Sequence, residues 1–252
     1  MKILTVIGSP RTNGNTYKTV RIIEKELVEK NAEIEFEYVQ LSKAGFELCK
    51  GCYVCIARGE ELCPLKDGRE SLEMKMKQAD AVIFAAPVYT YNVPWMFKNF
   101  LDRFAYRCHR PEFYGKKSMV VVSTAAIGLG FVALFMSFML ETMGFITCAK
   151  AGVTFPPLHE KDEKKWAKEI NKLKRQTGLF YKSLKDTKPV KPSLLKLIIF
   201  KMQQKGFSKA PEDSADYMFW ENKGWFEKGA AYYYKVHVWK IKRVIAALVS
   251  KL

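Results

Sequence analysis

The sequence predicts an α/β protein in which a doubly wound sheet of five parallel strands is followed by a mainly helical C-terminal appendage. Two observations favour this class. Apolar strand-like runs alternate with amphipathic helical stretches, a pattern that produces a parallel sheet covered on both faces. Five such runs fall within about 155 residues, which suits a sheet of strand order 2-1-3-4-5 that binds its ligand where the strands end.

The first half of the chain supplies three strands and three helices. Lys2–Ile7 is an apolar strand, and Thr16–Lys30 follows it as a helix with one apolar face. Glu33–Leu41 alternates apolar and polar residues, as an edge strand with one solvated face does. After an irregular, cysteine-bearing segment (45–68) come a short helix, a strand and a helix, predicted over Ser71–Gln78, Ala81–Ala86 and Pro94–Arg107.

Ser118–Leu140 is a stretch of 23 residues without a charge, long enough to cross a bilayer. Its middle contains Gly128 and Gly130, which separate the β-branched MVVVST from the helix-forming FVALFMSFMLETM. We therefore predict a buried strand, a glycine turn and a buried helix rather than a membrane span. A fifth strand (Phe145–Thr154) and a helix with one apolar stripe (Glu160–Leu184) complete the alternating pattern.

The proline-punctuated stretch TKPVKPS (187–193) divides the chain. We predict a flavodoxin-like domain over residues 1–185 and a basic, aromatic appendage over residues 186–252. The composition is that of a folded protein, since 48% of the residues are hydrophobic and 13% aromatic, and this excludes a largely disordered chain. The apolar run before Gly8 is too short for the core of a signal peptide, so we expect a cytoplasmic protein with reduced thiols.

The string GSPRTNGNT (8–16) directly follows the first strand and opens a helix. Its hydroxyl and amide side chains, the tight turn that Gly14 allows and the free N–H groups of the helix start are typical of a phosphate site. The alternative is a polar turn with a good helix cap. The string lacks both G-x-x-x-x-G-K-[ST] and G-x-G-x-x-G, which disfavours ATP or GTP hydrolysis and a dinucleotide fingerprint.

At these residues the chain resembles the flavodoxin-like NAD(P)H-dependent FMN reductases, especially their iron–sulfur flavoprotein branch. GSPRTNGNT is similar to the FMN phosphate loop of that family, APVYTYNVPWMFKNFLDR (86–103) to its second signature, and STAAIGLG (123–130) stands where its third flavin loop follows strand four. The resemblance, over residues 1–155, implies that the FMN phosphate is held by Ser9, Arg11, Asn13, Asn15 and Thr16. It implies that the isoalloxazine is lined by Pro87, Val88, Tyr89 and Asn92, with Thr124, Ala125 and Gly128 on the other side.

The residue chemistry agrees with that implication. Tyr89, Tyr91 and Trp95 offer flat surfaces beside a ring, and Asn92 offers donors and acceptors for its polar edge. Packing at a strand-to-helix corner is the alternative for these aromatic residues. The three histidines have no partner spacing and are expected to be surface or capping residues; they are His109, His159 and His237. Flavin chemistry needs no protein nucleophile, so we name no catalytic acid or base.

Four of the six cysteines form the pattern C-x2-C-x2-C-x7-C, at Cys49, Cys52, Cys55 and Cys63. This compact spacing favours a [4Fe-4S] cluster over zinc, which is usually held by two separated C-x2-C pairs. Bare thiols near the flavin remain a second interpretation. Arg58, Glu60 and Glu61 predict a hydrophilic and mobile final spacer, and we expect Cys108 and Cys148 to be ordinary buried or half-buried thiols.

The net charge of +16 suggests an anionic ligand, partner or surface. The appendage has 13 Lys and Arg against 6 Asp and Glu, a net of +7, together with 11 aromatic residues. Leu194–Met202 and Trp239–Leu252 are predicted basic amphipathic helices. The appendage is therefore interpreted first as a cap on the domain or on a sister subunit, and we hypothesise that it closes over the flavin. Contact with an anionic membrane surface, or with an acidic redox partner, is an alternative, and nucleic acid is unlikely as a partner.

These features together predict an FMN-dependent oxidoreductase that transfers electrons from NAD(P)H to a small acceptor such as a quinone or a free flavin. One alternative is an electron carrier that links ferredoxin-type donors to FMN through a cluster at the four cysteines. A further alternative is a non-enzymatic redox sensor. Members of the resembled family are usually dimers or tetramers, so a homodimer or homotetramer is expected.

Overall fold

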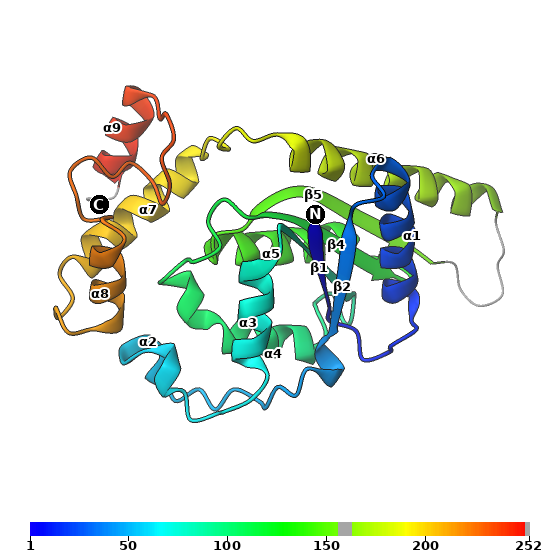
Figure 1. Ribbon diagram of the computed structural model, residues 1–252, viewed down its shortest axis with the longest axis horizontal. Helices are drawn as coiled ribbons and strands as arrows, with labels where there is room; N and C mark the ends of the chain where they lie inside the picture. The colour runs from blue at the N-terminus through cyan, green and yellow to red at the C-terminus, as the bar shows by residue number, and fades with distance from the viewer. Residues whose placement is uncertain (156–162, 250–252) are drawn as a thin grey trace.

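The computed structural model describes residues 1–155 and 163–249. Its centre is one five-stranded sheet with the order β2-β1-β3-β4-β5, and every neighbouring pair in it is parallel (Figure 1). The strands are β1 (Lys2–Ile7), β2 (Glu35–Gln40), β3 (Ala81–Pro87), β4 (Lys117–Thr124) and β5 (Ile146–Thr154). The predicted fold class and strand order are confirmed.

Helices cover both faces of the sheet, because alternate residues of each strand point to opposite sides. On one face α1 and α6 pack on residues such as Ile3, Ile83 and Val121. On the other face α3, α4 and α5 pack on residues such as Leu4, Phe84 and Val120. These helices are α1 (Asn15–Lys30), α3 (Arg69–Gln78), α4 (Trp95–Arg103), α5 (Leu129–Thr142) and α6 (Glu163–Lys185).

The uncharged stretch forms β4, a turn and α5, as predicted. Within the described residues, no helix is both long and apolar enough to cross a membrane. The helix predicted over Pro94–Arg107 ends at Arg103 and continues as a separate 3-10 turn, η3 (Ala105–Cys108). The first three residues of the helix predicted from Glu160, and His159, lie outside the described residues.

The cysteine-bearing segment contains only short turns of helix between β2 and α3. They are η1 (Leu41–Lys43), α2 (Val54–Ala57) and η2 (Glu60–Leu62). Backbone at positive φ bends the segment at Gly51 and Tyr53, with φ of 63° and 64°. The segment runs along the lower side of the molecule in Figure 1, and α2 lies beside the appendage helix α8.

The appendage consists of α7 (Leu194–Phe207), α8 (Ala215–Asn222) and α9 (Lys240–Val249), after α6 ends at Lys185. Its aromatic residues pack on one another around Phe200, Trp220 and Trp225, all of which are buried. Tyr114 of the sheet domain joins this cluster. Both predicted basic helices are present, although residues 250–252 lie outside the described part of the chain. The division into two domains at residue 185 stays a prediction.

Candidate functional site

The loop between β1 and α1 presents backbone N–H groups at a helix start. Gly14 is the N-cap of α1 and no side chain caps the helix, so its first N–H groups have no side-chain partner. Ser9 is buried, and its hydroxyl accepts a hydrogen bond from the N–H of Arg11 at 3.2 Å. Arg11, Asn13 and Asn15 are exposed. The loop therefore combines a rigid base with donors open to solvent, as an anion site requires.

Gly8 places this loop against α4. A Cβ at Gly8 would lie 2.5 Å from Cδ2 of Phe97, closer than two carbon atoms can approach. The backbone N–H of Gly8 also donates to the carbonyl of Ala85 in β3 at 2.7 Å. A glycine is thus required here by the close approach of α4, and it fixes the loop between β1 and β3, where the strand order reverses.

The three predicted flavin loops are joined by short neutral contacts. The hydroxyls of Thr16 and Ser123 share a buried hydrogen bond of 2.7 Å, and the N–H of Val88 donates to the carbonyl of Ser123 at 2.8 Å. Gly128, at φ 99°, lies against Val88, since a Cβ there would be 3.1 Å from Cγ1 of that residue. The hydroxyl of Thr16 is therefore already used in holding the loops together.

The turn after β3 is held in an unusual backbone conformation. Tyr89 and Asn92 exchange two backbone hydrogen bonds of 2.8 and 2.9 Å, and both residues between them have positive φ, 48° at Thr90 and 58° at Tyr91. Such φ values are uncommon in residues other than glycine, and they cluster at functional sites. The turn presents its aromatic side chains outward: Tyr89 is 42% exposed and Tyr91 58%.

The predicted flavin residues thus lie on three loops at one edge of the sheet. The structure brings together Ser9, Arg11, Asn13, Asn15, Thr16, Pro87, Val88, Tyr89, Asn92, Thr124, Ala125 and Gly128. Thr124 shapes the third loop, since its hydroxyl donates to the carbonyl of Ile127 and accepts from the N–H of Ala126, both at 3.2 Å. That these residues bind FMN stays a prediction.

The four cysteines of the C-x2-C-x2-C-x7-C pattern line one cavity. Cys49 and Cys52 are exposed, whereas Cys55 and Cys63 are half-buried. The cavity contains about 370 Å³ of empty space, part of it open to solvent, and its wall includes Arg69, Arg103 and Tyr106 in addition to the cysteines. The sequence pattern therefore becomes a spatial cluster of thiols with a cationic and aromatic base.

Side chains of α4 hold the start of the cysteine segment. Asn99 accepts a hydrogen bond from the N–H of Cys49 at 2.9 Å and donates to the carbonyl of Glu47 at 3.1 Å. Arg103 also donates to the carbonyl of Glu47, at 2.9 Å, and forms a two-pronged ion pair with Asp67. Burial disfavours the charged form of Asp67, but the Arg103 guanidinium outweighs it and holds the pKa of that carboxyl below its usual range.

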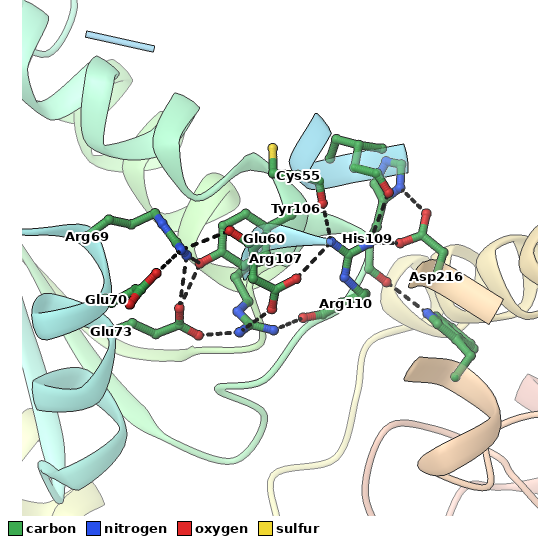
Figure 2. Close-up of polar contacts among 12 residues, drawn as sticks. Cys55, Glu60, Arg69, Glu70, Glu73, Tyr106, Arg107, His109, Arg110 and Asp216 are labelled. Atoms are coloured by element: carbon green, nitrogen blue, oxygen red, sulfur yellow. Dashed lines mark hydrogen bonds and ion pairs between the residues drawn. The ribbon is translucent and has the colours of Figure 1, made fainter. Parts of the chain in front are cut away.

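The spacer between Cys55 and Cys63 is anchored, contrary to the prediction that it is mobile. Glu60 forms ion pairs with Arg107 at 2.8 Å and with Arg110 at 3.1 Å, and its carbonyl accepts from Arg69 at 3.0 Å (Figure 2). All three arginines are buried. The hydrophilic spacer is therefore held by charges that lie in a different part of the sequence.

The structure also gives His109 a role that the sequence did not indicate. Its Nδ1 lies 2.7 Å from the carboxylate of Asp216 in α8, and its carbonyl accepts from the indole N–H of Trp220 at 2.8 Å. His109 caps the end of η3 and its side chain is 35% exposed, as expected, but it also contacts the appendage. No local spacing connects two residues 107 positions apart, so sequence patterns contained no signal for this pair.

The cysteine cavity is lined by four thiols from one short segment of the chain. Among the described residues, no three or more His, Cys, Asp or Glu side chains are arranged to hold one metal ion. A four-iron cluster takes one thiolate on each iron, so its ligands stand further apart than those of a single ion. Burial, with the other three thiols of the cavity nearby, raises the pKa of the Cys55 thiol.

Comparison with known proteins shows the family of this chain. A family model described as NADPH-dependent FMN reductase matches residues 1–157. The chain belongs to this family. An iron–sulfur flavoprotein of Archaeoglobus fulgidus is 32% identical over 228 residues, which cover 89% of this chain and 99% of that protein. The resemblance inferred from the motifs, to the iron–sulfur flavoprotein branch of a family of flavin-dependent NAD(P)H oxidoreductases, is confirmed.

Two further proteins resemble this chain, one in sequence and one in fold. An iron–sulfur flavoprotein of Clostridioides difficile is 30% identical over 176 residues, 68% of this chain and 77% of that protein. Among solved structures, RosB with a bound 8-demethyl-8-formylriboflavin-5'-phosphate intermediate superposes with a TM-score of 0.57 at 16% identity, over 84% of this chain and 88% of RosB. This structural likeness shows the shared fold.

The appendage of this FMN reductase family member packs away from the flavin loops. Asp216 and Trp220 of α8 contact His109 and Arg110, and Lys196 of α7 pairs with Glu141 of α5 at 2.9 Å. In Figure 1 these helices lie on the side of α2 and α5, remote from the loop that precedes α1. The hypothesis that the appendage closes over the flavin of its own chain is therefore not supported.

Proposed function

We propose that this chain is an FMN-dependent oxidoreductase that transfers electrons from NAD(P)H to a small acceptor such as a quinone or a free flavin. The observation that carries the proposal is the meeting of three loops at the edge where β1 and β3 end. In sheets of this order, ligands bind at that switch point. FMN, when bound, supplies the hydride chemistry, and the protein supplies binding, orientation and electrostatics.

In this proposal the first loop binds the FMN phosphate. The N–H groups at the start of α1, the exposed amides of Asn13 and Asn15 and the guanidinium of Arg11 are the donors open to an anion. Ser9 acts differently, because its hydroxyl accepts from the N–H of Arg11 and so shapes the loop. Thr16 takes part through its backbone, since its hydroxyl is engaged by Ser123.

The second and third loops line the isoalloxazine ring in this proposal. Pro87, Val88, Tyr89 and Asn92 form one wall, and Thr124, Ala125 and Gly128 form the other. The positive φ at Thr90 and Tyr91 holds the turn in a single geometry, so the wall is formed before the ring binds. Aromatic side chains with one exposed face are suited to contact a planar ring.

Titration of flavin-free protein with FMN, followed by flavin fluorescence, tests this site. We expect saturable binding of one FMN per chain and oxidation of NADH or NADPH with a quinone as acceptor. Asn13→Ala should weaken FMN binding by about tenfold, the loss of one hydrogen bond to a charged group. Asn31→Ala, at the far end of α1, is the matched control and should leave the affinity unchanged. A chain that binds no FMN would contradict the proposal.

We propose in addition that Cys49, Cys52, Cys55 and Cys63 hold a [4Fe-4S] cluster, which makes this chain competent to exchange electrons with ferredoxin-type proteins. The observation in favour is that all four thiols line one cavity. Iron and sulfide analysis of anaerobically purified protein should find about four irons per chain. Cys55→Ser should abolish iron binding, whereas Cys148→Ser, outside the cavity, should retain it. Iron-free protein that still binds flavin would contradict the proposed cluster, but it would be consistent with the proposed reductase activity.

We propose that the chain assembles as a homodimer or homotetramer through an apolar surface beside the flavin loops. Four large side chains that α5 and its flanking turn expose by more than half are Ile127, Phe131, Leu134 and Phe138. Exposed apolar patches of this kind mark interaction surfaces in water-exposed domains. Light scattering of Leu134→Glu should report a smaller assembly than wild type, with unchanged far-UV circular dichroism.

A further inference from the structure

A buried network of charges joins the cysteine segment to the appendage. The guanidinium groups of Arg69, Arg107 and Arg110 lie 5.3, 4.7 and 5.8 Å from the centre of the Tyr106 ring. Each of these arginines is less than 5% exposed, and the Tyr106 side chain is fully buried. Figure 2 shows the three guanidinium groups around that ring. So many buried positive charges are tolerated only when carboxylates face them.

Two of the required carboxylates come from the sheet domain. Glu73 accepts from the Tyr106 hydroxyl at 2.7 Å and pairs with Arg107, and Glu60 pairs with both Arg107 and Arg110. Glu70 also reaches Arg69, but its side chain is 66% exposed and its charge is screened by solvent. The domain therefore supplies one buried carboxylate, Glu73, and one half-buried carboxylate, Glu60, for three buried arginines.

A further buried carboxylate belongs to the appendage. Asp216 lies in the first turn of α8, is only 8% exposed and pairs directly with Arg110. Arg110 in turn donates to the carbonyl oxygens of Cys55 and of Ile56, the latter at 3.3 Å. A chain of direct contacts thus runs from α8 to the backbone of a cysteine that lines the cavity (Figure 2).

We propose that Asp216 is a positioning residue for the cysteine cavity: through Arg110 it fixes the stretch from Cys55 to Glu60, so that the appendage is part of the support of the cluster. This inference rests on the cluster of the proposed function. The appendage would then do more than cover the domain, since Asp216 neutralises Arg110, which holds the backbone of the cluster ligand Cys55. Its removal would loosen the cavity from a distance.

Hydrogen exchange of the full-length chain tests the mechanical part of the proposal. In Asp216→Asn the amides of residues 54–60 should exchange roughly tenfold faster than in wild type, because a charge-assisted buried bond is lost. Asp216→Glu should restore slow exchange. Lys223→Gln is the matched control, since it removes another contact of α8 with the domain, the 3.3 Å ion pair with Glu112, and leaves Arg110 untouched. Arg110→Lys tests the same link if Asp216→Asn does not fold.

The midpoint potential of the reconstituted cluster tests the electrostatic part. Loss of the Asp216 charge leaves Arg110 less neutralised, so the potential of Asp216→Asn should be more positive than wild type and that of Asp216→Glu close to it. Lys223→Gln should not move the potential. Equal exchange of residues 54–60 in wild type and Asp216→Asn overturns the inference. Protein that binds no iron would instead contradict the proposed cluster. Hydrogen exchange of that protein would still test whether Asp216 positions residues 54–60 through Arg110.

Discussion

The flavin loops and the cysteine cavity both contact helix α4 but are built in opposite ways. The flavin loops are joined by neutral contacts, the hydrogen bond between Thr16 and Ser123 and the close approach of Gly8 to Phe97. The cysteine cavity is held by buried ion pairs, such as that of Arg103 with Asp67. Helix α4 contributes to both, with Phe97 toward the loops and Arg103 toward the cysteines.

The difference shows which forces each site depends on. Each flavin loop directly follows a strand, so the topology of the sheet alone brings the loops together. The cysteine segment has little regular structure and depends on the side chains of Asn99, Arg103 and Arg110, which lie 36 to 56 residues from their partners in the chain. We therefore expect steric substitutions to damage the first site and changes of charge to damage the second.

The largest expected effect is the loss of one partner of a buried ion pair. Arg103→Ala leaves the carboxylate of Asp67 buried and unpaired, and it should lower the free energy of unfolding by about 3–5 kcal/mol. Urea denaturation measures it. The exposed pair of Lys98 with Asp102, one turn away on α4, is the control, and Lys98→Ala should cost at most about 1 kcal/mol. Equal losses of unfolding free energy in Arg103→Ala and Lys98→Ala would show that the buried ion pair is not what holds the cysteine segment.

The same contrast explains what the sequence predicted and what it did not. The strand order and the ends of β1 followed from apolar periodicity, because each depends on neighbouring residues, whereas the three flavin loops were predicted from a resemblance to a known family and stay a prediction. The anchoring of Glu60 and the contact of His109 with Asp216 were missed, since an ion pair between distant segments leaves no periodic signal. The end of α4 at Arg103 was misplaced because the apolar residues continue into η3.

A steric change at the flavin loops should have the next largest effect. Gly8→Ala puts a Cβ into the ring of Phe97 and should cost about 1–3 kcal/mol of stability, with weaker FMN binding. Gly178→Ala in α6 meets no atom within 4 Å and should stabilise the helix by about 1 kcal/mol. Thermal unfolding and FMN titration of both variants check this. Unchanged FMN affinity in Gly8→Ala would mean that the loop does not bind the cofactor.

Acid should loosen the cysteine side before the flavin loops. Burial opposes ionisation of Glu73, yet the nearby Arg107 holds its pKa below the usual range, and the pKa of Asp67 is lowered in the same way. Groups with a lowered folded pKa stabilise the fold above their unfolded pKa of about 4, and this stability is lost as pH falls through the folded value. Hydrogen exchange near pH 3 should show lost protection in residues 47–73 first. An equal loss of protection in residues 8–16 and 47–73 would show that the cysteine segment is no more dependent on charge than the flavin loops.

The smallest expected effect concerns α9, which is remote from both sites. Its Ile241, Val244 and Leu248 are 65%, 50% and 59% exposed beside basic residues, as in helices that lie on anionic membranes. Co-sedimentation with vesicles of phosphatidylcholine and phosphatidylserine should show weak binding that decreases with salt. Leu248→Ser should reduce it, without a change in FMN or iron content. Equal binding to vesicles of phosphatidylcholine alone would exclude an electrostatic contribution.

We propose that one chain holds FMN on loops joined by neutral contacts and an iron–sulfur cluster in a cavity held by buried ion pairs. The most direct test is the cofactor content of anaerobically purified protein, with flavin, iron and sulfide measured on the same sample. We expect about one FMN and about four irons per chain, with iron lost and flavin kept in Cys55→Ser. Protein that lacks either flavin or iron, and does not bind the missing cofactor on reconstitution, would contradict this proposal.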